Sequence, residues 1–435
     1  MTRKFLGIAS ILMLSSIPFC AEAQSASPLT LTQAEQIALK NHPQAAAAQY
    51  NALASNQVAR EARSAYFPTV QGDVTGSVAD HGTRIGAGYL TDSSLFNRFG
   101  QGITIDQLIT DFGRTGNLVA TSEFQARAAG EDAQATRYSV LLAVNQAFFE
   151  VLRSQALLKV AETTLSERQI VMNQVSAFVK NKLKSNLDLS FAQVNLAQAK
   201  LFEIRAQNNL KIAFAQLARA MGMENVAPYT LVEEPIPPAP PATADSLVDE
   251  AMRNRPEILS LTFTEQSAHK FERAERDLSL PSIVAEGDAG AVPLIAQLNA
   301  PRLIPNHYEA AAVNIEIPVF NGHLFAARRE AALLRARAAD ENLRDMRERI
   351  ARDTRVAWAN AVTSYQQIGV ANQFLNQAKL SAALAQGRYN LGLSSIVELS
   401  QAQLNEAQAG IQAVNAKYDF ENQNAILQYE TGTLR

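Results

Sequence analysis

A 17-residue motif occurs twice in this chain, with its copies 210 positions apart. The copies are residues 183–199 and 393–409, and both read L-x-S-x-x-x-L-S-x-A-Q-x-N-x-A-Q-A. Each copy places an acid at the same point, Asp188 in the first and Glu398 in the second. A motif repeated at this spacing indicates a duplication, so the two halves of the chain should fold alike.

Prolines repeat as well, at an offset of 213 positions. Pro43 aligns with Pro256, and Pro68 aligns with Pro281. Between the halves runs a Pro-rich segment that should be extended and act as a stiff spacer. A ligand for a proline-reading domain is the alternative for this segment. The mature chain then has three parts: a first repeat, residues 24–228; a Pro-rich linker, residues 229–243; and a second repeat, residues 244–435.

The first 23 residues have the features of a signal peptide. Arg3 and Lys4 precede a short apolar run, and a small-x-small cleavage site follows it. A membrane anchor is the alternative, but the run is well under the roughly 20 residues that span a bilayer. Cys20 is the only cysteine, so the mature chain would have no disulfide and no thiolate metal ligand. Lipid attachment at Cys20 is left open, although Phe19 stands where such signals need a small residue.

Two long stretches, 113–182 and 322–388, contain no proline and consist mostly of strong helix formers. A helix of about 68 residues would be about 100 Å long, too long for one compact domain. Each stretch leads into the duplicated motif, where Gly392 provides a chain reversal and Lys182 stands at the equivalent place. Each half should therefore hold one long helical hairpin. The return helices are 186–221 and 395–430, and the tips lie near 181–186 and 389–395.

Two local patterns refine these helices. Thr32 with Glu35 reads as a capping box and predicts a helix start, and Pro43 marks the break of that helix. A seam with steps of three and four residues runs through the first long stretch, as in a coiled coil. One isolated coiled coil is the alternative. The seam residues are Leu141, Val144, Phe148, Val151, Gln155, Leu158, Glu162 and Leu165.

The hydrophobic period changes from helical to alternating after Pro68 and Pro281. The best strand is 313–319, with apolar side chains on one face and Asn314 and Glu316 on the other. A soluble sheet with one wet face is the alternative reading of this strand. Three further strands are expected, which gives two per half, and two connectors read as exposed loops. The further strands are 69–78, 103–106 and 282–292, and the loops are 80–100 and 293–307.

The sequence contains no recognisable catalytic or ligand-binding pattern. The five histidines, His42, His81, His269, His307 and His323, show no pairing with acids that suggests a metal site, so surface or loop roles are expected. The Asp111-Phe112-Gly113 triplet lacks the other parts of a kinase and is read as chance. A net charge of −3 without clustered positive charge gives no indication of nucleic-acid binding. We expect no catalysis, no cofactor and no metal.

The assembled parts resemble the TolC family of bacterial outer-membrane efflux proteins. The most specific residues are 388–395 at the second tip, Arg388-Tyr389-Asn390-Leu391-Gly392-Leu393-Ser394-Ser395, followed by Ala402-Gln403. The junction residues Pro68, Pro281, Pro318 and Gly322 also stand where that family passes between helix and strand. The resemblance covers essentially the whole mature chain.

This resemblance implies a homotrimer that is mainly α with a β-barrel part. Twelve strands, four per chain, would close one barrel in the outer membrane, and a barrel of coiled-coil hairpins would continue it across the periplasm. Closure would remove the unpaired strand edges that lipid cannot satisfy. Apolar side chains would face lipid, while Thr104, Asp106, Asn314 and Glu316 would face the water-filled lumen. Tyr66, Phe67, Phe112 and Phe320 would form an aromatic girdle or pack in the junction core.

The resemblance also assigns the tips. They would form the periplasmic entrance, with Asp188 and Glu398 giving six carboxylates per trimer; a solvated face is the alternative for each acid. Gln401 and Ser394 replace an acid and an arginine of the best-known members, so the closed state should be latched differently. The adaptor would contact the tips at Leu183, Ser185, Arg388, Tyr389, Gly392, Leu393, Ser394 and Ser395.

The function implied is an outer-membrane exit duct of a tripartite efflux or type I secretion system. Such a duct works with an inner-membrane exporter and a periplasmic adaptor, and the substrate is not specified by its sequence. The alternative is a periplasmic coiled-coil adaptor or structural protein without a membrane barrel.

Overall fold

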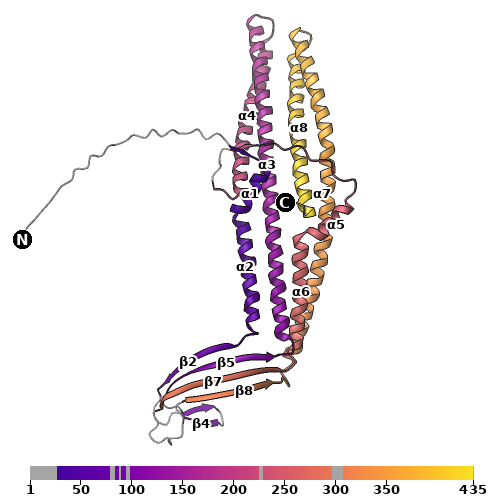
Figure 1. Cartoon of the computed structure of the whole chain (residues 1–435). Coiled ribbons are helices and arrows are strands. Elements are labelled where there is room, and N and C mark those ends of the chain that lie inside the picture. The colour runs from indigo at the N-terminus through magenta and orange to yellow at the C-terminus, as the bar shows by residue number, and fades with distance from the viewer. Residues whose placement is uncertain are drawn as a thin grey trace, which may run out of the picture.

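The computed structural model of the chain describes residues 27–78, 84–87, 90–94, 98–224, 229–295 and 307–434. The expected signal peptide, with Cys20, lies outside these residues, as does His81. Two helical hairpins rise side by side from one small sheet, and their tips lie at the end farthest from that sheet (Figure 1). Within the described ranges, no helix combines the length and the apolar character needed to cross a bilayer.

The helices repeat in the order short, medium, long and long. The longest, α3 and α7, have 67 residues each, which corresponds to about 100 Å at 1.5 Å per residue. The long helices and return helices predicted from the sequence are confirmed to within about two residues at each end. The first repeat contains α1 (Leu31–Asn41), α2 (Pro43–Ser64), α3 (Arg114–Lys180) and α4 (Asn186–Ala220). The second contains α5 (Asp245–Asn254), α6 (Pro256–Asp277), α7 (Leu324–Asn390) and α8 (Ile396–Thr431).

The duplication is visible where each hairpin returns to its short helix. Gly222 ends α4 with φ 70°, and a Cβ there would lie 2.8 Å from the backbone of Asn41. Gly432 ends α8 with the same φ, and a Cβ there would lie 3.0 Å from Asn254. Only glycine combines a left-handed conformation with so close a backbone approach. The same contact thus closes both repeats.

Four strands form one antiparallel sheet in the order β2-β5-β7-β8. The two strands of each repeat are confirmed, but β8 ends at Glu316 rather than at residue 319. Pro318 explains the difference, because proline has no N–H for a ladder and restricts the residue before it. The strands are β2 (Thr69–Ser77), β5 (Arg98–Thr110), β7 (Ser282–Ile295) and β8 (His307–Glu316).

The expectation of plain loops at 80–100 and 293–307 is wrong in part. A hairpin of β3 (Arg84–Ala87) and β4 (Leu90–Ser94) lies inside the first connector. Strand β5 begins inside that connector, β7 ends inside the second, and β8 begins at its last residue. Glycines in these segments suggested loops, yet local strand pairing overrides that composition. The remainder of both connectors lies outside the described residues.

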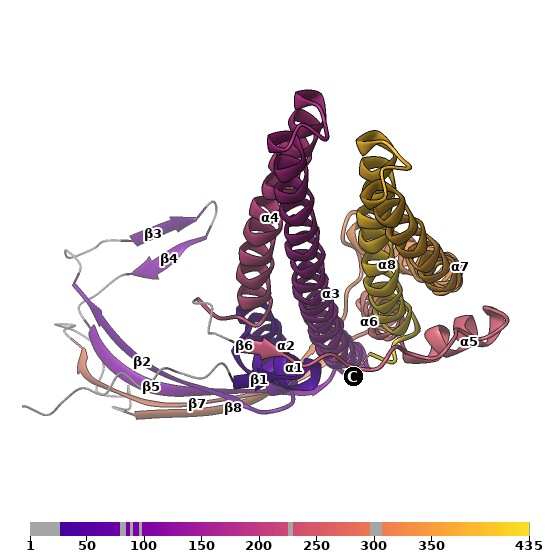
Figure 2. The same ribbon diagram turned by 90° about the horizontal axis from the view of Figure 1, so that it is seen from above.

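The sheet has one mainly apolar and one mainly polar face, as its register shows. Val70 pairs with Ile105, and Ile105 pairs with Gly287 on the apolar face. On the opposite face Asp106 pairs with Glu286. Alternation places Thr104, Asp106, Asn314 and Glu316 together on that polar face, as the sequence predicts. The strands lie below and to one side of the helices, and the sheet is curved (Figure 2).

The Pro-rich linker is anchored at both ends. It begins with β6 (Tyr229–Leu231), which pairs in parallel with β1 (Ser27–Leu29) at the start of the described chain. The first three residues of the linker are therefore extended as a paired strand. Near its other end the Pro241 carbonyl accepts a hydrogen bond of 2.9 Å from the Trp358 indole of α7. Leu29 and Leu231 enter a buried cluster with Phe148 of α3, so the linker completes the middle of the helical body.

The predicted capping box is displaced by two residues. Thr30, at the end of β1, is the N-cap of α1, and it exchanges hydrogen bonds with Gln33. Thr32 lies inside the helix, and Glu35 is buried, where its carboxylate accepts a 2.6 Å hydrogen bond from Asn145 of α3. Thr30 rather than Thr32 is the N-cap, because Thr30 has the extended conformation that an N-cap needs and Thr32 is already helical.

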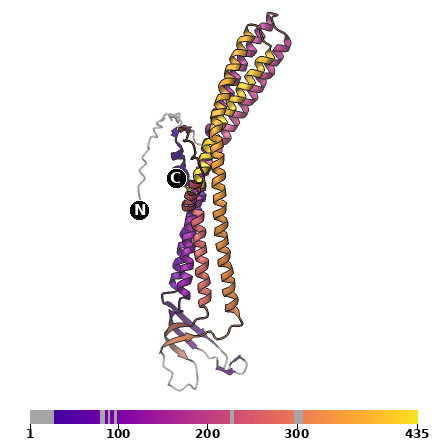
Figure 3. The same ribbon diagram turned by 90° about the vertical axis from the view of Figure 1, so that its right-hand side faces the viewer.

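The predicted seam of α3 holds only over its first half. Leu141, Val144, Phe148 and Val151 are buried, but Glu162 is exposed. Beyond Val151 four of the six buried positions are spaced seven residues apart instead: Ser154, Ala161, Arg168 and Val175. The other two are Leu152 and Val171. The partner of α3 changes along its length, with α2 and α6 near the sheet and α4 and α8 near the tip (Figure 3). The single seam of an isolated coiled coil is therefore not kept.

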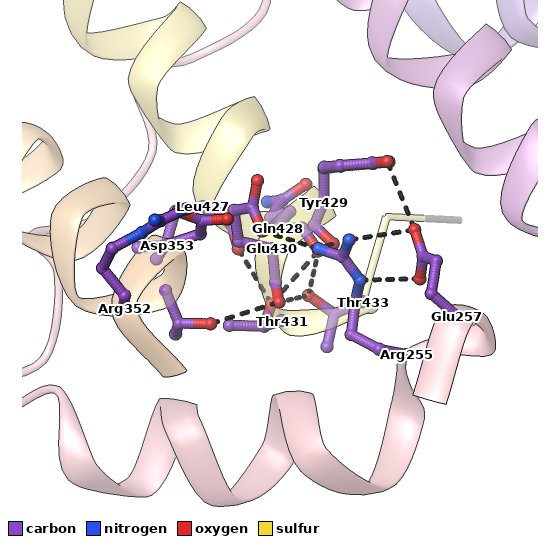
Figure 4. Close-up of polar contacts among 11 residues, drawn as sticks. Arg255, Glu257, Arg352, Asp353, Leu427, Gln428, Tyr429, Glu430, Thr431 and Thr433 are labelled. Atoms are coloured by element: carbon purple, nitrogen blue, oxygen red, sulfur yellow. Dashed lines mark hydrogen bonds and ion pairs between the residues drawn. The ribbon is translucent and has the colours of Figure 1, made fainter. Parts of the chain in front are cut away.

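A buried ion-pair network joins the start of α6 to the end of α8 (Figure 4). The Arg255 guanidinium, 8% exposed, contacts Glu257 at 2.9 Å and Glu430 at 2.6 Å. It also donates to the Tyr429 carbonyl and lies 4.7 Å from the centre of the Tyr429 ring. This network fixes the C-terminal end of the second hairpin against its short helices.

Candidate functional site at the hairpin tips

The two tips have the same turn. Leu183 N–H donates to the Phe178 carbonyl at 2.9 Å, and Leu393 N–H donates to the Arg388 carbonyl at 2.9 Å. These bonds close the ends of α3 and α7 in Schellman fashion, which requires a left-handed residue before each leucine. Gly392 takes that conformation in the second tip and Lys182 in the first, with φ 60°. The predicted reversal is confirmed, including the equivalence of these two positions.

Both return helices start at a serine cap. The Ser185 hydroxyl accepts from the Asp188 N–H, and the Asp188 carboxylate accepts from the Ser185 N–H at 2.9 Å. This reciprocal pair is a capping box at the start of α4. Ser395 caps α8 by accepting from the Glu398 N–H at 3.2 Å. The two acids thus lie in the first turn of their helices, where the helix dipole favours negative charge.

The two acids differ in their surroundings. Asp188 is held within its own cap, whereas Glu398 faces Arg388 across the second tip at 3.4 Å. Arg388 also donates to the Leu393 carbonyl at 3.4 Å. The structure places one acid on each tip, and both tips lie at the same end of the molecule (Figure 1). It does not bring Asp188 and Glu398 into contact with each other.

Tyr389 is the buried anchor of the tips, with 1% of its surface exposed. The Lys184 ammonium of the first tip lies 4.7 Å from its ring centre, a cation–π contact between the two hairpins. Burial, together with the nearby Asp188 charge, raises the pKa of the Tyr389 hydroxyl. Within the described chain neither this hydroxyl nor that of Ser394 has a hydrogen-bond partner, although both are buried.

Apolar side chains project from the tips around this anchor. Leu183 and Leu393, both predicted as contact residues, are exposed. Leu187 and Leu391 share this character and were not singled out from the sequence. Their signal was available, because Leu187 belongs to the duplicated motif and Leu391 to the specific second-tip stretch. Exposed leucines gathered at one end of a molecule indicate a contact surface.

Polar contacts hold the two hairpins of the chain together below the tips. Asn195 donates to the Ser400 hydroxyl at 2.8 Å, and Gln174 donates to Asn390 at 2.9 Å. Deeper still, the buried Arg168 guanidinium contacts the Gln403 amide. Sequence reasoning missed these contacts, although Asn195, Ser400 and Gln403 lie in the duplicated motif. Polar residues of this kind are equally typical of a solvated helix face and of a contact between two helices. The sequence therefore did not indicate that these residues join the two hairpins.

The predicted junction residues lie between the helices and the sheet. Pro68 directly precedes β2, Pro281 directly precedes β7, and Pro318 follows β8 by two residues. Gly322 has φ 63° just before α7. In the first repeat the equivalent bend uses Phe112, with φ 56°, and the Asp111 carboxylate caps α3 by accepting from the Thr115 N–H at 2.7 Å. The kinase-like triplet is therefore a helix start.

The four aromatic side chains near these junctions are exposed in the single chain. They are Tyr66, Phe67, Phe112 and Phe320. Packing in a core of this chain, the alternative considered for each of them, is not observed. Phe320 instead meets the ring of His323 edge to face, with 6.0 Å between ring centres.

The expectation that no histidine pairs with acids is wrong. His269 of α6 lies one turn after Glu265 and faces Asp340 of α7. The Glu265–His269 spacing of four is readable in the sequence. Asp340, however, is 71 positions from His269 and could not be placed beside it without the fold.

Comparisons with known proteins agree with this architecture. The model of the family described as outer membrane efflux protein matches residues 35–223 and, separately, 247–433. The TolC outer membrane protein of Vibrio cholerae is 23% identical over 319 residues, 72% of each chain. The TolC protein of Salmonella enteritidis is 21% identical over 444 residues, covering 99% of this chain and 87% of its own length.

A solved structure of the outer-membrane channel OprN has the same fold, with a TM-score of 0.81 at 16% identity, covering 92% of this chain and 89% of its own. The family model matches most of the chain and matches it once per repeat. This is a transport protein of the outer membrane rather than an enzyme. The chain belongs to the outer membrane efflux protein family.

Proposed function

We propose that three copies of this chain form one closed duct that receives substrate from an inner-membrane exporter and a periplasmic adaptor. One observation carries the proposal: the sheet is two-faced and has two open edges. Among the residues that the structure describes, β2 pairs only with β5, and β8 pairs only with β7. Unpaired edges are not tolerated in lipid, because their N–H and C=O groups have no partners there. Pairing β8 of one copy with β2 of the next satisfies both edges in a ring.

The faces of the sheet support the same assembly. Exposed apolar side chains, among them Val70, Ile103 and Val313, lie on one face. Carboxylates of Asp106, Glu286 and Asp288 lie on the other. A closed barrel with apolar residues outside and polar residues inside meets both lipid and a water-filled lumen. The exposed aromatic side chains at the junctions then lie at the level of the periplasmic membrane surface.

The division of the chain follows from the same picture. Residues 1–23 act as the signal peptide for export. Residues 24–228 and 244–435 each supply two barrel strands and one hairpin, and residues 229–243 link them. Three chains give twelve strands and six hairpins about 100 Å long, enough to cross much of the periplasm.

The tips form the periplasmic entrance and the adaptor contact in this assembly. Six carboxylates, Asp188 and Glu398 from each chain, surround the opening and attract cations. The exposed leucines provide the apolar contact for the adaptor, and the buried Tyr389 holds the two tips together beneath them. Arg388 pairs with Glu398 of its own hairpin. This ion pair, and not residue 394, then stabilises the second tip.

Cysteine cross-linking in detergent tests the trimer. Gln71→Cys in β2 is combined in turn with Ala310→Cys, Ala312→Cys or Asn314→Cys in β8, all on the polar face. We expect at least one pair to give disulfide-linked species up to trimers. The control replaces Gln71→Cys by Thr104→Cys in the inner strand β5, and these pairs should give no cross-link. A water-soluble monomer without cross-links contradicts the proposal and favours a periplasmic adaptor or structural protein.

Single-channel recording tests the entrance. The double variant Asp188→Asn/Glu398→Gln should lower cation selectivity in planar bilayers, because it removes six charges from the opening. The matched control is Glu341→Gln/Glu348→Gln, which removes exposed acids of α7 away from the tips. Unchanged selectivity in the first variant, with a functional trimer, rejects the acidic ring.

A further inference from the structure

Three metal-ligating side chains converge where α6 packs against α7. The His269 Nε2 lies 2.9 Å from an Asp340 oxygen and 3.5 Å from a Glu265 oxygen. One ligating atom from each side chain lies within 4.8 Å of the other two. We propose that Glu265, His269 and Asp340 bind a divalent transition-metal ion that links α6 to α7.

The distances suit such an ion. Two ligand atoms bound to Zn²⁺ at about 2.0–2.1 Å and a tetrahedral angle lie about 3.4 Å apart. The two distances from His269 Nε2 fall on either side of that value. Only small side-chain movements are then needed to replace the imidazole proton between His269 and Asp340 by a metal ion. Paired ligands one turn apart on one helix, completed from a facing helix, are how helical bundles build metal sites.

The donor set selects the class of ion. One imidazole and two carboxylates favour Zn²⁺, Cu²⁺, Ni²⁺ or Co²⁺ over Ca²⁺ or Mg²⁺, which prefer oxygen ligands alone. The three side chains are between one quarter and one half exposed. The ion can therefore enter directly from solvent, and water can fill the remaining coordination position.

The first repeat shows that the duplicated fold does not require this cluster. The positions equivalent to Glu265, His269 and Asp340 are Ala52, Asn56 and Gly130. There the Asn56 amide donates instead to the Ala52 carbonyl of its own helix at 3.0 Å. Helices α2 and α3 pack against each other without any of the three ligands. The three ligands are thus present in the second repeat alone.

Isothermal titration of ZnCl₂ into tag-free, EDTA-treated protein in detergent tests the proposal. We expect one Zn²⁺ per chain and a higher unfolding temperature on binding. His269→Asn installs the residue of the first repeat, and Asp340→Asn removes the ligand from α7. Each should weaken Zn²⁺ binding by more than about tenfold, because loss of a group that only supports a ligand can already weaken binding by about that much. His323→Asn is the control and should bind Zn²⁺ as the unaltered protein does.

Circular dichroism shows whether each variant is folded. If His269→Asn does not fold, the binding measured with Asp340→Asn decides the test. X-ray absorption of the unaltered Zn²⁺-loaded protein should show one imidazole with oxygen ligands. The proposal is overturned if Zn²⁺ neither binds nor changes the unfolding temperature, or if both ligand variants bind it unchanged. In either case the cluster is only a hydrogen-bonded ion pair between α6 and α7.

Discussion

Lys182 and Gly392 occupy the same left-handed position in the two hairpin turns, with φ of 60° and 75°. A side chain in this conformation crowds its own backbone at a cost of about 1–2 kcal/mol, whereas glycine has no such cost. Nothing lies within 4 Å of a Cβ built at Gly392. The two turns therefore differ in backbone strain and not in the space available.

Lys182→Gly should stabilise the first tip. Part of the relieved strain is offset by the greater freedom of glycine in the unfolded chain, so we expect a net gain of up to about 1 kcal/mol. Slower proteolysis at the tip and a higher unfolding temperature would show it. Lys182→Ala is the control, because it removes the charge and keeps the Cβ. An equal gain from alanine would mean that charge, rather than backbone strain, is responsible.

Arg255→Met should be strongly destabilising. It leaves the Glu257 and Glu430 carboxylates without their cation in a buried site, a change that costs about 3–5 kcal/mol. The matched control is Arg352→Met in the same region (Figure 4), because Arg352 is 66% exposed in its pair with Asp353. An exposed pair contributes at most about 1 kcal/mol. Thermal unfolding in detergent compares the two, and similar losses would contradict the role of Arg255.

The helical hairpins were predictable because their signals are local and repeated. Long runs of helix-forming residues without proline predicted the two 67-residue helices, and the duplicated motif predicted both turns. The junction prolines likewise gave the change from helix to strand. Each of these depends on residues close together in the chain, and a second copy confirmed each reading.

The failures involve partners distant in sequence or competing local signals. Thr30 rather than Thr32 caps α1 because β1 makes it extended, and β1 exists only by pairing with β6, about 200 positions later. Asp340 beside His269 and Gln403 beside Arg168 need the packing of α7 and α8 against earlier helices. The seam of α3 changes at Val151 because its neighbours change. No single-helix pattern carries that information.

Glu421 gives the protein a pH-dependent stability. Burial is the main cause that raises the pKa of this carboxyl to about 7, with the neighbouring Glu233 and Glu234 adding to the effect and Lys417 opposing it. The folded chain thus keeps a proton that the unfolded chain releases near pH 4.5. Stability from this group is full below about pH 4.5 and is lost as the pH rises to about 7, by roughly 3 kcal/mol per chain.

Glu421→Gln should therefore flatten the dependence of unfolding temperature on pH between about pH 4.5 and about pH 7. At the alkaline end the variant should be more stable than the unaltered protein, because glutamine needs no proton to remain neutral. Glu341→Gln, at an exposed position of α7, is the control and should leave the slope unchanged. A slope that persists in Glu421→Gln would show that another group causes it.

The two tip acids should respond differently to the same substitution. Asp188→Ala removes the carboxylate that accepts from the Ser185 N–H and hydroxyl, but it keeps the backbone N–H of residue 188 that donates to Ser185. Loss of this half of the capping box should cost about 1 kcal/mol of stability. Glu398→Ala removes only a half-exposed pair with Arg388 and should cost less than about 0.5 kcal/mol. Thermal unfolding gives both values, and equal losses would contradict the difference between the two tips.

Asp188→Asn then separates the capping role of Asp188 from its charge. The amide oxygen still accepts from the Ser185 N–H, so stability should change little, while three negative charges leave the entrance of a trimer. Reduced cation selectivity with an unchanged unfolding temperature would assign the charge to conduction. If instead selectivity stays the same and only Asp188→Ala lowers stability, Asp188 serves the start of α4 alone, and Glu398 is the remaining candidate for the acidic entrance.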